Sequence, residues 1–410
     1  MNSNTLSIDS PEFLHKSAKP GWLDHHARRI LLAKLENLRY GEVTIVEKDR
    51  SQTFGRADEA FPLAVTVTVK SPRFYGDVAF GGIVGSGEAY IQDYWECSDL
   101  VALDRILLRN RSVLENMDGG AAVLTKPLRK AFHWLNRNTR SGSRRNIAAH
   151  YDLGNDFYAL WLDPQMMYSC AWYADETTTL EEAAVAKLDL ICRRLNLRPH
   201  DRVVEIGTGW GGFAVHAAKH YGCHVTTTTI SDEQHAYARQ RIVQEGLEDR
   251  ITLLKKDYRD LEGQFDKLVS IEMIEAVGHD YLDTYFRKCA SLLKPDGELL
   301  IQAITIADQR YEFAKRNVDF IKRYVFPGGF LPSVTAMTSS LTRETDLRAI
   351  HIEDIGLHYA RTLRDWRDRF FEHIEQVREQ GFSDEFIRLW EFYLTYCESA
   401  FLERAIGDVH

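Results

Sequence analysis

The feature that most constrains this chain is a succession of short apolar strands and helical segments between residues 202 and 306. The runs RVVEI, HVTTTTI, ITLLKKD, KLVSI and ELLIQAITI are typical of strands, whereas DEQHAYARQRIVQEG and DTYFRKCASLL are typical of helices. Parallel strands need helical crossovers of this kind, so the pattern predicts an α/β domain with a doubly wound parallel sheet. We expect one further strand over residues 347–356 and long helices over 361–377 and 384–404 to complete the domain.

The residues before this domain follow a different pattern. A helical stretch over 21–38 precedes alternating runs at 41–48 and 63–71, GEVTIVEK and LAVTVTVKS, which indicate strands. A chain of 410 residues is long enough for two domains. We therefore predict a small α+β domain over residues 1–118, a linker over 119–149 and a larger α/β domain over 150–410.

The linker region is strongly basic. Residues 119–151 contain no Asp or Glu, and Leu128, Phe132, Trp134 and Leu135 alternate there with basic side chains. The seven basic residues are Lys126, Arg129, Lys130, Arg137, Arg140, Arg144 and Arg145. Two interpretations stay open: a segment that binds an anionic membrane surface, and a solvated linker with a short amphipathic helix.

The overall composition argues against several classes of protein. A net charge of -9 gives no support for nucleic-acid binding, and the six cysteines form no C-x-x-C pair that would indicate a disulfide framework or a structural zinc. We expect no metal site. The sequence has neither an apolar stretch long enough to span a membrane nor the pattern of a signal peptide, so we expect a cytoplasmic protein.

The segment VVEIGTGWGG, residues 203–212, places a glycine-rich loop directly after the first strand of the α/β domain. Gly207, Gly209 and Gly212 fit G-x-G-x-x-G, which is a weak signal for a dinucleotide site when it stands alone. Glu205 inside the strand would repel a pyrophosphate, but it could attract a cationic ligand through one water. The alternative is a carboxylate that neighbouring backbone donors satisfy.

The region after the second strand also argues against a dinucleotide. A ribose-binding acid is expected there, whereas the sequence offers Ile230 and Ser231, with Asp232 opening the next helix. The pattern E-x-G-x-G-x-G-G, with KKDYRD after the third strand, fits S-adenosylmethionine better. Asp257 or Tyr258 would then contact the adenine.

Several separated motifs resemble the cyclopropane fatty acid synthase family, which includes the mycolic acid cyclopropane synthases. They are HYDLGNDFYALWLDPQMMYSCAWY (150–173), EIGTGWGGFA (205–214), SIEMIEAVGHDYLDTYF (270–286), LLIQAIT (299–305), IKRYVFPGGFLPS (321–333) and LHYARTL (357–363). The resemblance implies a Rossmann-like class I methyltransferase domain preceded by a sterol-carrier-like lipid-binding domain. It also implies a homodimer at the inner leaflet that transfers a methylene group to the cis double bond of unsaturated acyl chains in membrane phospholipids.

The resemblance assigns roles to particular residues. Cofactor contacts fall on Tyr168, Ser169, Glu205, Gly207, Gly209, Trp210, Gly211, Thr229, Ile230, Ser231, Gln234, Tyr258 and Arg259. A catalytic bicarbonate, the base of the family, would be held by Cys170, Glu275, Gln302, Ile304 and Tyr359. Gln302 departs from the histidine that the family commonly has, and it cannot relay a proton as imidazole does. A methyl or methylene branch is therefore the alternative product.

Two further positions carry expectations. Cys397 matches a cysteine once suspected as a nucleophile in relatives, although burial in the core is the preferred interpretation. The sequence stops at AIGDVH, where the family's final strand is only beginning, and we expect an incomplete edge strand to cost stability rather than chemistry. Other classes that stay open are a lipid-binding protein with a vestigial transferase domain and a NAD-dependent oxidoreductase.

Overall fold

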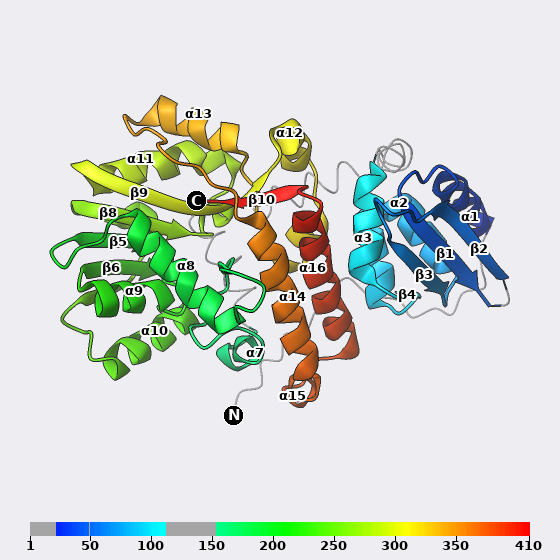
Figure 1. Cartoon of the computed structure of the whole chain (residues 1–410), viewed down its shortest axis with the longest axis horizontal. Coiled ribbons are helices and arrows are strands. Elements are labelled where there is room, and N and C mark those ends of the chain that lie inside the picture. The colour runs from blue at the N-terminus through cyan, green and yellow to red at the C-terminus, as the bar shows by residue number, and fades with distance from the viewer. Residues whose placement is uncertain (1–21, 49, 112–152) are drawn as a thin grey trace.

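The computed structural model describes residues 22–48, 50–111 and 153–410, and it contains two separate β-sheets. The four-stranded sheet uses residues before Ser98, and the six-stranded sheet uses residues after Asp201. The two sheets lie at opposite ends of the molecule, with the last helices of the chain between them (Figure 1). The predicted basic linker over 119–149 lies outside the described residues.

The six-stranded sheet confirms the predicted α/β fold. Its order is β10-β9-β8-β5-β6-β7, and all neighbours are parallel except β10 and β9. The strands are β5 (Arg202–Ile206), β6 (His224–Thr229), β7 (Ile251–Lys255), β8 (Phe265–Ile271), β9 (Leu293–Ile306) and β10 (Ile406–Val409). The strand order reverses at β5, which pairs with both β6 and β8, so this is where a ligand is expected at the carboxyl end of the strands.

Helices cover both faces of this sheet. Successive residues of β5 point to opposite faces, because Val203 belongs to one apolar cluster and Val204 to the other. Helices α8 (Leu180–Arg194), α9 (Gly212–His216) and α10 (Asp232–Gln244) contribute to the first cluster, and α11 (Leu282–Leu292) and α13 (Val334–Glu344) to the second.

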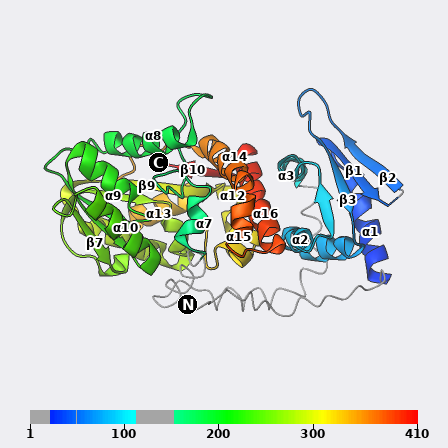
Figure 2. The same ribbon diagram turned by 90° about the horizontal axis from the view of Figure 1, so that it is seen from below.

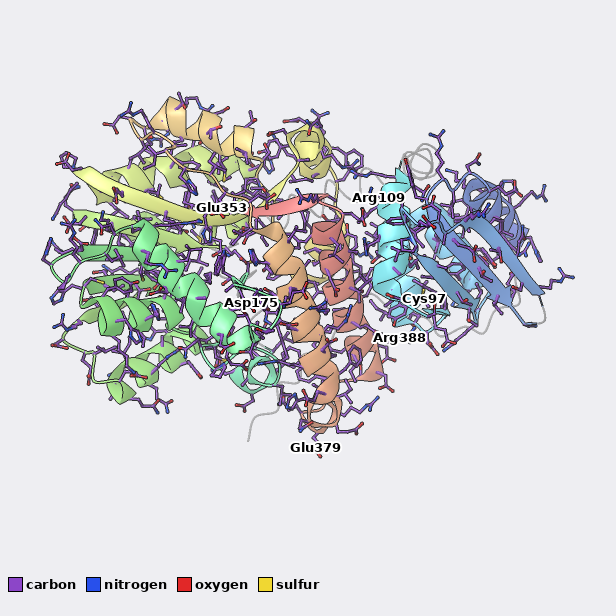
Figure 3. The ribbon with its side chains drawn as sticks, in the orientation of Figure 1. Cys97, Arg109, Asp175, Glu353, Glu379 and Arg388 are labelled. Atoms are coloured by element: carbon purple, nitrogen blue, oxygen red, sulfur yellow. The ribbon has the colours of Figure 1, made fainter. Side chains whose placement is uncertain are left out.

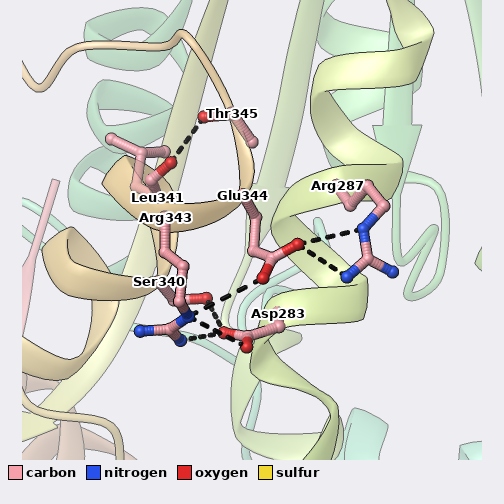
Figure 4. Close-up of polar contacts among 7 residues, drawn as sticks. All are labelled: Asp283, Arg287, Ser340, Leu341, Arg343, Glu344 and Thr345. Atoms are coloured by element: carbon pink, nitrogen blue, oxygen red, sulfur yellow. Dashed lines mark hydrogen bonds and ion pairs between the residues drawn. The ribbon is translucent and has the colours of Figure 1, made fainter.

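Polar contacts fasten α13 to α11 at the surface. Arg343 pairs with Asp283, which also accepts a hydrogen bond of 2.6 Å from the Ser340 hydroxyl (Figure 4). Arg287 pairs with Glu344 at 2.6 Å. These exposed ion pairs add little to the apolar packing that holds the two helices on the sheet.

One predicted strand is absent. Residues 347–356 form no strand apart from a single bridge between Asp354 and Val409. Ile350 is 87% exposed and Ile352 is 50% exposed, so the alternating apolar residues that suggested a strand do not face the core. The expected long helices over 361–377 and 384–404 are α14 (Gly356–Glu372), α15 (Ile374–Glu379) and α16 (Asp384–Leu402), and α7 (Asn155–Ala159) and α12 (Asp308–Arg316) lie beside them.

The small domain is a mixed sheet with helices, in agreement with the α+β prediction. It contains α1 (Trp22–Leu35), β1 (Gly41–Glu47), β2 (Arg50–Arg56), β3 (Ala64–Val69), α2 (Arg73–Ile91), β4 (Trp95–Cys97) and α3 (Leu100–Arg109). Strand β1 pairs with β2 in antiparallel and with β3 in parallel orientation.

Helices α2 and α3 of the small domain pack against α16 of the larger domain (Figure 2). Glu403, whose side chain is 3% exposed, pairs with both Arg105 and Arg109 of α3. The Tyr90 hydroxyl donates to Glu391 at 2.6 Å. Arg388 of α16 points toward the small domain and donates to the Trp95 carbonyl oxygen at 2.9 Å (Figure 3). The two domains therefore share a contact of buried rings and paired charges.

Candidate active site

The glycine loop after β5 is built for close approach of a ligand. Gly207, Gly209 and Gly211 have φ values of 100°, 53° and 87°, in the left-handed region that favours glycine. A Cβ added to Gly209 would meet no atom within 4 Å. The loop is held to strand β6, because the backbone amide of Thr208 donates to the Thr228 carbonyl oxygen at 3.0 Å.

Most residues predicted to bind the cofactor line one cavity of about 700 Å³ that contains this loop. Those that line it are Tyr168, Ser169, Glu205, Gly207, Gly209, Trp210, Thr229, Ile230, Gln234, Tyr258 and Arg259. The remaining two do not line the cavity: Gly211 precedes α9, and the Ser231 hydroxyl accepts from the Gln234 amide at 3.3 Å and caps α10.

The polar side chains of this region are held in place by their neighbours. Glu205 is 2% exposed and accepts a hydrogen bond of 2.6 Å from the Thr227 hydroxyl. Burial raises the pKa of Glu205 to about 8. Asp257 pairs with Arg259 at 2.6 Å at the end of β7. The open glycine loop, the buried Glu205 and the Thr229–Gln234 contact of 2.9 Å fit an adenosyl ligand with a cationic end.

A cluster of three buried carboxyl groups lies just after the end of β8, beside β9 and β10. It consists of Glu272, Glu275 and Asp408, of which Glu272 and Glu275 line the same cavity as the glycine loop. Burial raises the pKa of Glu272 to about 7 and that of Glu275 to about 8, where the charge of Glu272 adds to the effect. Lys187, which is fully buried, donates to the Ser169 hydroxyl at 2.7 Å and supplies a positive charge near the cluster.

The residues predicted to hold bicarbonate come together, but three of them, Cys170, Gln302 and Tyr359, bind the Glu272 side chain. The Cys170 amide and Gln302 Nε2 each donate to Glu272 Oε1 at 2.7 Å, and the Tyr359 hydroxyl donates to Oε2 at 2.7 Å. The Ile304 amide donates to Glu275 Oε1 at 2.5 Å. Bicarbonate would have to displace the Glu272 carboxylate to reach these donors, so this arrangement does not fit a bound bicarbonate.

Glu272 occupies a strained backbone position. Its φ is 46°, and a non-glycine residue in the left-handed region costs roughly 1–3 kcal/mol that the surroundings must offset. Its amide donates to the Gln302 carbonyl oxygen at 2.8 Å, which continues the pairing of β8 with β9 for one residue. Strain of this kind is concentrated at functional sites.

The last strand contributes to the site, contrary to the expectation that it affects only stability. Asp408 of β10 accepts a hydrogen bond of 2.9 Å from Gln302 Nε2, and His410 Nε2 lies 3.1 Å from Gln302 Oε1. Strand β10 pairs with β9 directly beside Gln302, which explains why these side chains meet. Gln302 itself is fully buried behind the cavity wall.

Cys170 and Cys397, the two cysteines considered for the site, are in their protonated thiol form. Burial raises the pKa of both Cys170 and Cys397. Cys170 contributes its backbone amide to the site, whereas Cys397 lines the cavity on α16. The raised pKa values oppose thiolate formation, so a nucleophilic role for Cys397 has no support from its environment.

From the carboxyl cluster the cavity continues between the two domains. Its walls include the rings of Tyr168, Phe326, Tyr359, Tyr393 and Phe401 and apolar side chains of the small domain. Leu31 and Leu35 come from α1, Val78, Ile83 and Val84 from α2, and Leu107 from α3. This wall is predominantly apolar and suits a hydrocarbon chain.

The sheet order, the glycine loop at its switch point and the cavity define a class I S-adenosylmethionine-dependent methyltransferase. Comparison with known proteins gives the family. The model of the mycolic acid cyclopropane synthetase family matches residues 138–410, and the chain belongs to this family. It is thus an enzyme of S-adenosylmethionine-dependent one-carbon transfer to fatty acyl chains.

Three relatives illustrate the similarity. Cyclopropane-fatty-acyl-phospholipid synthase of Escherichia coli (strain K12) is 38% identical over 83% of this chain and 85% of its own length. Tuberculostearic acid methyltransferase UfaA1 of Mycobacterium tuberculosis is 36% identical over 78% of this chain and 76% of its own length. The crystal structure of mycolic acid cyclopropane synthase CmaA1 complexed with SAH and CTAB has a TM-score of 0.60 and 30% identity, and the match covers 65% of this chain and 95% of that chain.

Sequence reasoning missed three buried charged residues of the site: Glu272, Asp408 and Lys187. Glu272 had a detectable signal, because SIEMIEAVG places a second carboxylate three residues before Glu275 at the end of a strand. Asp408 lies in a short terminal strand that was assigned no chemical role. Lys187 belongs to the amphipathic helix α8, and its burial depends on packing that sequence periodicity does not specify.

Proposed function

We propose that this enzyme transfers a methylene group from S-adenosylmethionine to the cis double bond of unsaturated acyl chains in membrane phospholipids and forms a cyclopropane ring. One observation carries the proposal: a single cavity joins the glycine loop, the carboxyl cluster and an apolar wall that both domains build. The phospholipid substrate is supported by the Escherichia coli relative, whose name specifies a fatty-acyl phospholipid.

The chemistry requires a dry pocket with aromatic walls. An alkene is a poor nucleophile, and S-adenosylmethionine, when bound, supplies a sulfonium methyl group that is electrophilic enough to react with it. Addition of that methyl group leaves a carbocation on the acyl chain. The rings of Tyr168, Tyr359 and Phe401 line the cavity, and aromatic rings can stabilise a cation without forming a bond to it. A base must then remove a proton from the new methyl group while the ring closes.

We include no bicarbonate in this reaction, because the Glu272 side chain binds three of the donors that would hold it. Glu275 remains at the site as a second carboxyl group. Among the described residues, its Oε2 atom is buried without a hydrogen-bond partner. Glu275 lines the cavity, so a bound substrate would lie next to this residue.

The alternative outcome is a methyl or methylene branch on the acyl chain. It is favoured by the tuberculostearic acid methyltransferase relative and by the Gln302 position, where the chain departs from the family's histidine. A methylene branch needs one additional hydride shift before the proton leaves, and a saturated methyl branch needs in addition a hydride from an added reductant and a proton. The same residues would bind the substrates in both cases.

Access to the lipid requires the enzyme to lie on the membrane. No helix among the described residues is long and apolar enough to cross a bilayer. We infer peripheral association with the inner leaflet through the basic segment 119–151, and a homodimer as the functional unit. Reversing the charges of Arg137, Arg140, Arg144 and Arg145 should weaken sedimentation with anionic vesicles. Unchanged sedimentation would show that the basic segment only links the two domains and does not bind the membrane.

The central experiment incubates the purified protein with S-adenosylmethionine and vesicles of a phospholipid with one cis double bond per chain. We expect release of S-adenosylhomocysteine and acyl chains that have gained one CH₂. Fragmentation in mass spectrometry separates a ring from a methylene branch, and a saturated methyl branch carries two more hydrogens. Vesicles of a fully saturated phospholipid are the matched control, and equal release on both lipids would exclude the proposed reaction.

A further inference from the structure

The position that a proton-accepting anion would occupy is filled by a side chain of this protein. Glu272 Oε1 accepts from the Cys170 amide and from Gln302 Nε2, and Oε2 accepts from the Tyr359 hydroxyl, each at 2.7 Å. A carboxylate and a bicarbonate both present a planar O–C–O group to such donors. One set of three donors cannot hold both.

The neighbouring residues are arranged around this carboxylate. An amide nitrogen carries two hydrogens, and Gln302 uses them to bridge Glu272 and Asp408, at 2.7 Å and 2.9 Å. His410 at 3.1 Å from Gln302 Oε1 fixes the other end of the amide. Gln302 is therefore a positioning residue for Glu272. This arrangement gives a physical reason for a glutamine at this position.

The carboxylate is also placed where the reaction would occur. Glu272 lines the cavity together with the glycine loop and the Tyr359 ring. Glu272 directly follows β8, and its backbone adopts the left-handed conformation with φ 46°. Hydrogen bonds from the protein occupy three of its lone-pair positions, and a carboxylate has about four. One acceptor position thus remains for a substrate proton.

We propose that the Glu272 carboxylate is the proton acceptor of the reaction and replaces a bound bicarbonate. This inference rests on the proposed methylene transfer. In the step, a C–H bond of the transferred methyl group breaks, and its electron pair forms the C–C bond that closes the ring on the cationic carbon. The proton passes to Glu272 and leaves to solvent after the product departs. No other reactant is consumed.

The first test measures turnover of the wild-type enzyme on unsaturated phospholipid vesicles in buffer freed of carbon dioxide, with and without added bicarbonate. We expect equal rates in both. A rate that falls in the freed buffer and returns with bicarbonate would overturn the proposal. If no S-adenosylhomocysteine forms under either condition, the proposed function fails instead, so the two failures are distinguishable.

The second test uses variants. Glu272→Gln keeps the shape of the side chain but cannot accept the proton, and we expect turnover to fall by at least about 100-fold with cofactor binding retained in calorimetry. Glu262→Gln changes an exposed carboxylate and is the matched control with wild-type turnover. Glu272→Gly exposes the three donors, and added bicarbonate or formate should restore part of the lost turnover. More than half of the wild-type turnover in Glu272→Gln would overturn the proposal.

Discussion

The contact between the two domains can be tested at one glycine of α2. A Cβ added to Gly87 would lie 2.5 Å from a ring carbon of Phe320 and 3.0 Å from a ring carbon of Phe392. Carbon atoms pack best at about 3.5–4.0 Å, so the rings would have to move by about 1 Å. Both rings are almost fully buried, which leaves them little room. Overpacking of this kind costs roughly 1–3 kcal/mol.

The matched control is Gly81→Ala in the same helix, where an added Cβ meets no atom within 4 Å. Helix α2 is kinked at Gly82, next to Gly81, so helix propensity does not act equally at the two sites. Both substitutions restrict the unfolded chain by about 0.4–1 kcal/mol, so their difference reports mainly the packing cost. We expect Gly87→Ala to be less stable than Gly81→Ala by roughly 1–3 kcal/mol in urea unfolding followed by tryptophan fluorescence. Equal stabilities would mean that α2 does not pack against the Phe320 and Phe392 rings in solution.

Three further perturbations have expected outcomes. Turnover should fall about tenfold per pH unit below about 7, because Glu272 must be ionised to accept the proton. Burial raises the pKa of Glu272, which lies near Glu275, Asp408 and Lys187, to about 7. A kcat/KM profile that is flat from pH 5 to 8 would contradict this prediction. Glu275→Gln should abolish product and spare cofactor binding in calorimetry, because its carboxylate accepts the β9 amide at the reacting end of the cavity; unchanged turnover would contradict it. Glu403→Ala leaves Arg105 and Arg109 of α3 without their buried partner, so it should lower the free energy of unfolding by about 1–3 kcal/mol. Wild-type stability of this variant would show that the two ion pairs do not stabilise the protein.

The fold was predictable because each strand of the α/β domain is an apolar run with its own turn signal. The same reasoning failed at residues 347–356, where Ile350 and Ile352 alternate with polar residues but point to solvent. Periodicity specifies which residues share a face and leaves open whether that face is covered. The antiparallel pairing of β10 was also not encoded in any local pattern.

That most residues predicted to bind the cofactor lie around one cavity could be expected from the sequence for a similar reason. The glycine loop is contiguous in sequence, and its function depends on backbone conformation at Gly207 and Gly209. The acid–base half was only partly predictable, since it gathers side chains from β8, β9, β10 and α14. The family resemblance named Cys170, Gln302 and Tyr359 together, and the structure places them side by side, but the sequence could not show that Glu272 accepts their hydrogen bonds.

Helix α16 packs against α2 and α3, and its Cys397 and Phe401 line the cavity together with side chains of these two helices. In the proposed reaction, the small domain therefore forms one wall of the cavity in which the carbocation would arise. Were this wall to open during turnover, water would reach that cation and capture it as an alcohol. The fidelity of ring formation thus depends on residues that never touch the methyl donor.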